Sequence, residues 1–171
     1  MWVTNIRISD KDSDSESKFW DYGGNTVIST YSYARLTPDV PSKAGYIVSK
    51  TVCSCNTLHG NPSRRVHGDG FAFWFTEKQA NERGDAFGGP GKFNGLGNSF
   101  PYVSGMVNDG NRVFNHANDG SGSINGGCEV KLSVNGDGKW SSCFTIDNVN
   151  LPSKGYLGFT AATGEVSGSH F

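Results

Sequence analysis

A set of polar residues in glycine-rich turns carries the clearest chemical signal in this sequence. Its members are Ser42, Asp69, Asn98, His116, Asn118, Asp119 and the turn formed by Gly164 and Glu165. A carboxylate can accept hydrogen bonds from two hydroxyl groups at once, while backbone amides and an imidazole donate in return. The set therefore suits a neutral, hydroxyl-rich ligand whose apolar face an aromatic ring can cover. Asp and Asn oxygens are also the ligands that calcium prefers.

Each member of this set also has a purely structural explanation. Asp-Gly is a common turn dipeptide, so the HGDG stretch at residues 67–70, taken alone, predicts a tight turn before it predicts a site. His116 stands at the end of an expected strand, where a histidine is more often a structural residue than a ligand-binding one. The two explanations stay open at this level.

Arrangements typical of enzymes are missing from the sequence. There is no Gly-x-Ser-x-Gly motif, and no expected strand carries the pair of carboxylates that a glycoside hydrolase needs. The glycines at 88–91 lack the strand and helix that would aim their amides at a phosphate. We therefore expect no enzymatic activity. A glycoside hydrolase is the least favoured of the functions considered in this subsection.

Composition bounds the class of protein. The 171 residues suffice for one domain with a hydrophobic core, and 15 Lys and Arg against 16 Asp and Glu give no basic surface for nucleic acid. No apolar run reaches the ~18 residues of a membrane span, and the first residues do not resemble a signal peptide. The 24 glycines and 12% aromatic residues, without long helical periodicity, predict an all-β fold.

The strand at residues 70–75 is the most apolar short segment. Its alternation puts Phe71, Phe73 and Phe75 on one face and Ala72 and Trp74 on the other. Because both faces are apolar, we expect a central strand in a packed sandwich.

Other segments give weaker expectations. Residues 10–18 predict a solvated stretch, so residues 1–18 are expected to form a polar arm and 19–171 the domain. Further expectations are a hairpin of 26–33 with 46–52, a helical turn or two in 76–83, a loop over 84–97, a return strand at 112–116 after the 108–110 turn, and closing strands at 128–134, 140–149 and 155–162.

Four cysteines are present, Cys53, Cys55, Cys128 and Cys143, and their spacing fits no common zinc motif. A disulfide between Cys128 and Cys143 would close a loop of ~15 residues, worth ~3 kcal/mol, and would indicate an oxidising compartment. Free buried thiols explain the same residues equally well.

Several stretches together resemble one family, the leguminous-type (L-type) lectins of the early secretory pathway. These are membrane-anchored receptors that bind high-mannose glycans on glycoproteins. The matching stretches, in family order, are FWDYGGNTV at 19–27, ARLTPD at 34–39, SKAG at 42–45, HGDGFAFW at 67–74, FG at 87–88, FNGLG at 93–97, FPYVS at 100–104, MVNDG at 106–110, HANDG at 116–120, GC at 127–128, LP at 151–152 and GYLGFTAATG at 155–164.

The resemblance implies a concanavalin-like antiparallel β-sandwich (jelly roll), a disulfide between Cys128 and Cys143, and a calcium-dependent mannose site in the lumen of the endoplasmic reticulum and Golgi. The residues matching the family's sugar-binding positions are Ser42, Asp69, His116, Gly164, Glu165 and Val166. Glu165 replaces the family's aspartate. Asp119 matches a calcium-binding aspartate.

The chain also departs from the family. After residues 95–97 the family's Asp-x-aromatic-x-Asn stretch, which supplies most calcium ligands, is missing, and Asn98 is the expected substitute for its asparagine. Similar gaps fall in 52–66 and 128–143, and the sequence stops at Phe171, before the family's closing strand. We therefore expect a sandwich shortened by several strands, which a protein partner could complete. The alternative function is a structural or assembly subunit that has lost calcium-dependent sugar binding.

Overall fold

The structure is a computed structural model that describes residues 5–7, 18–29, 33–53, 70–100, 104–114, 127–132, 139, 141–147 and 150–164. For residues 5–7, 33, 98–100, 104, 127–132 and 141–147, the backbone alone is described. The regular elements in these ranges are all β-strands, in agreement with the predicted all-β class. No helix in the described ranges is both long and apolar enough to span a bilayer.

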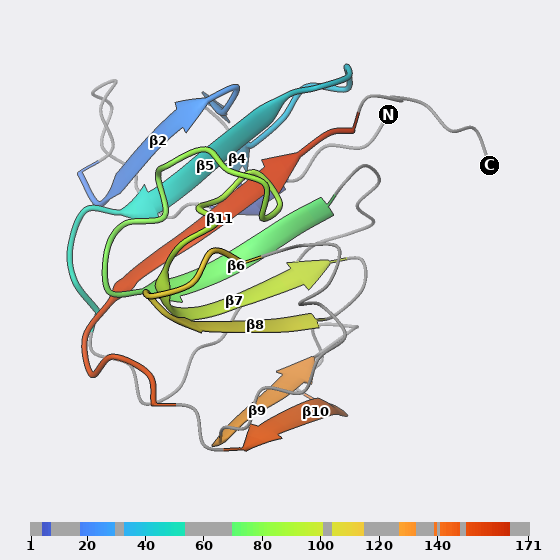
Figure 1. Cartoon of the computed structure of the whole chain (residues 1–171). Helices are drawn as coiled ribbons and strands as arrows, with labels where there is room; N and C mark the ends of the chain where they lie inside the picture. The colour runs from blue at the N-terminus through green and yellow to red at the C-terminus, as the bar shows by residue number, and fades with distance from the viewer. Residues whose placement is uncertain are drawn as a thin grey trace.

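The strands form three antiparallel sheets (Figure 1). A six-stranded sheet has the order β2-β5-β11-β6-β7-β8, a three-stranded sheet has the order β1-β4-β3, and β9 pairs with β10. The strands are β1 (Asn5–Arg7), β2 (Trp20–Gly24), β3 (Val27–Ser29), β4 (Tyr33–Arg35), β5 (Ala44–Ser49), β6 (Gly70–Thr76), β7 (Asn94–Phe100), β8 (Ser104–Asp109), β9 (Gly127–Leu132), β10 (Ser141–Asp147) and β11 (Tyr156–Ala162).

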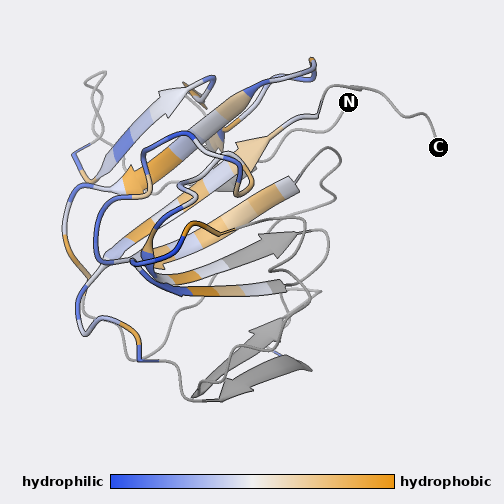
Figure 2. Ribbon diagram, viewed as in Figure 1, coloured by the Kyte–Doolittle hydropathy of each residue, from blue (hydrophilic) through white to orange (hydrophobic). Residues whose placement is uncertain are grey.

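Strand β6 lies inside the six-stranded sheet, between β11 and β7, as its two apolar faces predicted. On one face, Phe71 packs with Ile47 and Ala161 against Ala34 and Leu36, which come from β4 and the residue that follows it. This cluster joins the six-stranded sheet to the three-stranded sheet, so the two sheets form the layers of a sandwich. Figure 2 shows the apolar residues concentrated along β5, β6 and β11.

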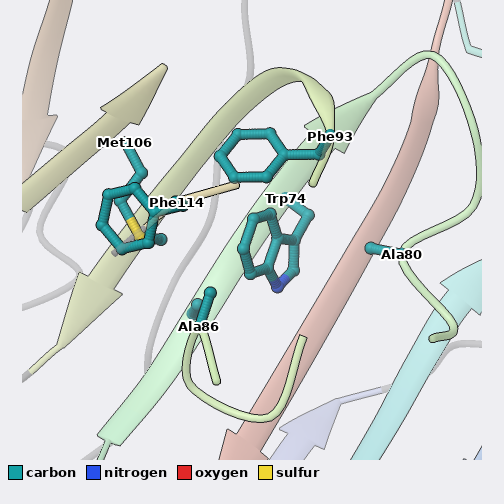
Figure 3. Close-up of a cluster of buried hydrophobic side chains, with 7 residues drawn as sticks. Trp74, Ala80, Ala86, Phe93, Met106 and Phe114 are labelled. Carbon is teal, nitrogen blue, oxygen red and sulfur yellow. The ribbon is translucent and has the colours of Figure 1, made fainter. Parts of the chain in front are cut away.

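The opposite face of the six-stranded sheet is covered by the segment that connects β6 to β7, residues 77–93. Trp74 is fully buried there and packs with Phe93 in an edge-on contact, 5.0 Å between ring centroids (Figure 3). Ala80 and Ala86 of the connecting segment, together with Met106 and Phe114, complete this cluster. In Figure 1 the segment crosses in front of β5 and β11. Both faces of the sheet are therefore packed.

Three local expectations differ from the structure. Strand β5 pairs with β2 and β11, so the predicted hairpin of 26–33 with 46–52 is wrong. Residues 77–83 form bends with no helical turn, because Ala80 is buried in the Trp74 cluster and the segment runs across the sheet. Residues 111–114 follow the predicted turn but form no strand, since the Phe114 amide donates to the Gly91 carbonyl instead.

The boundaries of the strands also differ from expectation. Strand β1 pairs with β4 and lies before Phe19, where ordered structure was expected to begin. Strand β7 begins at Asn94, inside the stretch 84–97 that was expected to be a loop, and its backbone pairs with β6, so the loop ends earlier than expected. The closing strands were predicted correctly as β9, β10 and β11.

The register of β9 and β10 does not support the predicted disulfide. Cys128 pairs with Ile146, whereas Cys143 lies at the register shift between Ser142 and Phe144. Ile146 is three residues along β10 from Cys143, about 10 Å of strand, and a disulfide requires Cα atoms within about 7 Å of each other. The side chains of both cysteines lie outside the described residues. Cys53 is a free, half-buried thiol.

Candidate carbohydrate-binding site

At one end of the six-stranded sheet, β5 and β6 begin and β11 ends at the same level. We call the three residues at this level, Ala44, Ala162 and Gly70, the row. Ala162 at the end of β11 pairs with Ala44 at the start of β5 and with Gly70 at the start of β6. Adjacent strands are about 4.8 Å apart, so the row spans about 10 Å. Ser42 lies two residues before Ala44, Asp69 directly precedes Gly70 in the chain, and Gly164 lies two residues after Ala162. The row therefore brings together three chain segments that the sequence analysis singled out.

Ser42 is exposed and occupies the left-handed backbone region, with φ of 55°. Its amide donates a hydrogen bond of 3.0 Å to the carbonyl of Gly164. This bond joins two of the predicted sugar-binding positions directly, although they lie far apart in the sequence. The Ser42 side chain is thus presented at the surface beside the end of β11.

Ala44 is held in place from the side of β2 as well. The amide of Asn25 donates to the Ala44 carbonyl at 2.8 Å, and the Asn25 side-chain oxygen accepts from the Ala44 amide at 3.3 Å. Gly24, with φ of 66°, lies so close that an added Cβ would stand 2.4 Å from the Ala44 carbonyl oxygen. The start of β5 is therefore a rigid base for Ser42.

The segment that covers Trp74 reaches the same row at Phe87 and Gly88. Both have positive φ, 53° and 77°. A Cβ added to Gly88 would lie 2.8 Å from the Ala161 carbonyl oxygen and 3.3 Å from the Ala44 Cβ. The absence of a side chain thus lets this loop pack against the row. Sequence reasoning placed Phe87 and Gly88 in an expected loop and in a stretch of the family resemblance, but the positive φ of Phe87 had no signal in the sequence.

Thr163 is the residue of this region that sequence reasoning missed. Its hydroxyl accepts from the Lys43 amide at 2.9 Å and donates to the Val40 carbonyl at 2.7 Å. Its own amide donates to the Lys43 carbonyl at 2.8 Å. A possible signal was its place between an expected strand and Gly164, where a threonine has backbone partners within reach.

The other predicted site residues are not placed. Asp69, His116, Asp119, Glu165 and Val166 lie outside the described residues, so their roles stay predictions. Only the backbone of Asn98 is described, in the middle of β7 and opposite Phe73. Phe73 is three residues along β6 from Gly70, about 10 Å from the row. The prediction of Asn98 as a metal ligand also stays untested.

Calcium binding stays a prediction for this chain, because the candidate ligand Asp119 and the side chain of the candidate ligand Asn98 lie outside the described residues. The described residues contain no group of three or more His, Cys, Asp or Glu side chains that could hold a metal ion. Calcium takes six to eight oxygen ligands. What the described part of the site does offer is a hydroxyl group and backbone hydrogen-bonding groups.

Two ionisable groups among the described residues have a shifted pKa. Burial, with the Asp21 carboxylate as a smaller cause, raises the pKa of Tyr46 above its ordinary value. Hydrogen bonds from Asn111 lower the pKa of Asp109, the last residue of β8, at the opposite end of the sheet from Gly70. Neither of these two residues belongs to the row of Ala44, Ala162 and Gly70.

Sequence comparison relates the chain to carbohydrate-binding proteins. The model of the legume-like lectin family matches residues 9–135 and 124–170. A VIP36-like protein of Bos taurus is 30% identical over 200 residues, covering 91% of this chain and 57% of that protein. The vesicular integral-membrane protein VIP36 of Mus musculus is 31% identical over 199 residues, covering 91% of this chain and 55% of that protein. The chain thus spans a little over half the length of these curated relatives.

The fold is shared with a solved relative. The exoplasmic/lumenal domain of VIP36 in its calcium- and mannose-bound form superposes with a TM-score of 0.73 and 27% identity, covering 96% of this chain and 84% of that domain. The fold is accordingly the antiparallel β-sandwich of that domain. The 200-residue alignment with the bovine relative is longer than the 171-residue chain, so the relative carries segments within the aligned span that this chain lacks.

Proposed function

The chain belongs to the legume-like lectin family, and from that premise we propose that it binds high-mannose N-glycans on glycoproteins during their transport or quality control. The proposed compartment is the lumen of the endoplasmic reticulum and Golgi, as for relatives whose names describe a vesicular membrane protein with a lumenal domain. The proposed activity is binding without catalysis.

The observation that supports this function most is the row of Ala44, Ala162 and Gly70. Residues just outside a rigid sheet edge can be held with the precision that hydrogen-bond recognition requires. Three segments that resemble the sugar-binding segments of the family leave the sheet at this row. The VIP36 domain of the same fold is known in a mannose-bound form.

Hydrogen bonding explains how such a site would select a sugar. The Asp69 carboxylate would accept from two adjacent hydroxyls of one ring, which fixes their relative orientation. The exposed Ser42 hydroxyl and the backbone around Gly164 would supply further bonds on the other side of the row. The VIP36 domain is known with calcium and mannose bound together, whereas each contact named here would be made by the chain itself.

The test is retention on immobilised mannan with elution by free mannose. We expect the wild-type protein to be retained and Asp69→Ala to pass through, because the alanine cannot accept from the sugar hydroxyls. Asp109→Ala is the matched control, since this exposed aspartate pairs across from Asn94 at the other end of the sheet, and it should be retained. Flow-through of the wild-type protein, or equal retention of Asp69→Ala, would overturn the proposal.

One observation favours a second candidate function. Because the sequence runs from Gly97 into Asn98 without the Asp-x-aromatic-x-Asn stretch of the family it resembles, the chain could serve as a structural or assembly subunit with the lectin fold and no sugar affinity. That function predicts flow-through of the wild-type protein on mannan both with calcium and with a chelator. It also predicts a stable complex with a protein partner that completes the sandwich.

A further inference from the structure

We propose that Thr163 is a positioning residue of the glycan site, whose side-chain hydroxyl fixes the loop that carries Ser42 against the loop that begins at Gly164. The inference rests on the proposed function and extends it to a residue that is not itself expected to touch the sugar. It starts from a set of hydrogen bonds between residues 40–43 and 163–164 at the end of the six-stranded sheet.

The two segments are joined by backbone and side-chain bonds of different kinds. The backbone contributes two, from the Thr163 amide to the Lys43 carbonyl at 2.8 Å and from the Ser42 amide to the Gly164 carbonyl at 3.0 Å. The Thr163 hydroxyl accepts from the Lys43 amide at 2.9 Å and donates to the Val40 carbonyl at 2.7 Å, with the Lys43 carbonyl as a second, longer acceptor at 3.3 Å. The ladder of β5 and β11 thus continues past Ala44 and Ala162 with a side chain as one of its partners.

The hydroxyl constrains the loop on both sides of Ser42. Val40 lies two residues before Ser42 and Lys43 one residue after it, so one oxygen atom holds both flanks of the left-handed residue. Without the hydroxyl, the Lys43 amide and the Val40 carbonyl lose this partner, while the two backbone bonds remain. The loop would then sample more conformations, and binding a sugar would require ordering it again.

Because of its position, Thr163 should influence the order of the Ser42 loop more than the stability of the whole fold. Thr163 lies past the last paired residue of β11 and is only partly buried, and segments at strand ends open locally without unfolding the core. Loss of its hydroxyl should therefore act on glycan affinity more than on the folding of the sandwich. Thr76 offers a matched comparison, because its hydroxyl also donates to a backbone carbonyl, that of Lys78 at 2.7 Å, at the opposite end of β6.

The experiment compares Thr163→Val, Thr163→Ser and Thr76→Val with the wild-type protein. Titration calorimetry with a mannose disaccharide measures affinity, and amide hydrogen exchange measures protection at Ser42 and Lys43. Thr163→Val should bind about tenfold more weakly, as expected for loss of ~1.4 kcal/mol, and should exchange faster at these amides. Thr163→Ser retains the hydroxyl and should restore both values to within about twofold of wild type, and Thr76→Val should leave both unchanged.

The outcomes separate the inference from the function on which it rests. Wild-type affinity in Thr163→Val, or an equal loss of affinity in Thr76→Val, would overturn the role of Thr163 while leaving the glycan site intact. A failure of Thr163→Ser to restore affinity would overturn it as well. Absence of binding by the wild-type protein would instead refute the proposed function, and the positioning role would fall with it.

Discussion

Ser42 carries a backbone conformation that serine rarely adopts. Its φ of 55° costs a residue with a Cβ about 1 kcal/mol or more. Such conformations persist where the surroundings hold them, and here the carbonyl of Gly164 and the hydroxyl bonds of Thr163 do so. A glycine would avoid the cost, whereas the serine places a hydroxyl at the exposed surface.

Replacing Ser42 by glycine should lower glycan affinity while leaving the stability of the fold nearly unchanged. Glycine accepts this φ without strain, which offsets the greater freedom of glycine in the unfolded chain, so the free energy of unfolding should change by less than ~1 kcal/mol. Glycan affinity should fall about tenfold, because one hydroxyl hydrogen bond is lost. Urea denaturation and calorimetric titration measure the two quantities. Unchanged affinity in Ser42→Gly would remove Ser42 from the site.

At the scale of elements, β6 and the segment of residues 77–93 form one packing unit around Trp74. A Cβ added to Gly97 of β7 would lie 2.7 Å from the indole ring and 2.8 Å from the Met106 methyl group. One added to Gly89 of the covering segment would lie 2.5 Å from the same ring. The Trp74 indole nitrogen donates to the Thr160 hydroxyl at 2.8 Å. Two glycines therefore make room for the ring, and one hydrogen bond fixes its orientation.

Gly97→Ala should accordingly destabilise the fold by ~1–3 kcal/mol, because an overpacked core must shift side chains or backbone. Gly158→Ala is the control, since Gly158 also pairs with Trp74 but its added Cβ would meet nothing closer than 3.5 Å. Chemical denaturation followed by tryptophan fluorescence compares the two. Equal effects of the two substitutions would show that the space around Trp74 is not the cause.

These elements also show what a sequence can predict. The alternation of residues 70–75 was enough to predict β6 as a strand with two apolar faces, because the residues of the strand itself determine the character of each face. The partner of β5 was not predictable in this way, since β11 lies more than a hundred residues later and local turns favoured a nearby hairpin. Ser42 and Gly164 were singled out among the polar turn residues and again through the family resemblance. Thr163 was not, because its partners are backbone groups of a loop distant in sequence.

At the scale of the whole molecule, the six-stranded sheet has two chemically different ends. One end holds Ala44, Ala162 and Gly70, with the loop at Gly88 against them. The other holds Thr76 with Tyr156 and Gly95, and the Cys53 bridge to Gly155. The candidate glycan residues that are described, and the chain neighbours of Asp69, belong to the first end. A ligand should therefore affect the molecule asymmetrically.

Hydrogen exchange with and without a mannose oligosaccharide measures this asymmetry along the chain. We expect added protection in peptides that cover residues 40–44, 67–70 and 162–166, because a bound sugar would shield amides and suppress opening of these loops. Peptides that contain Cys53 or Gly155 should exchange at the same rate in both states, since they lie at the far end of the same strands. Protection confined to β9 and β10, or to the Thr76 end, would move the binding surface away from the row. Protection confined to the row would instead show that the binding site lies at three neighbouring strand ends. The sandwich would then keep this site although the chain lacks segments that its relatives have.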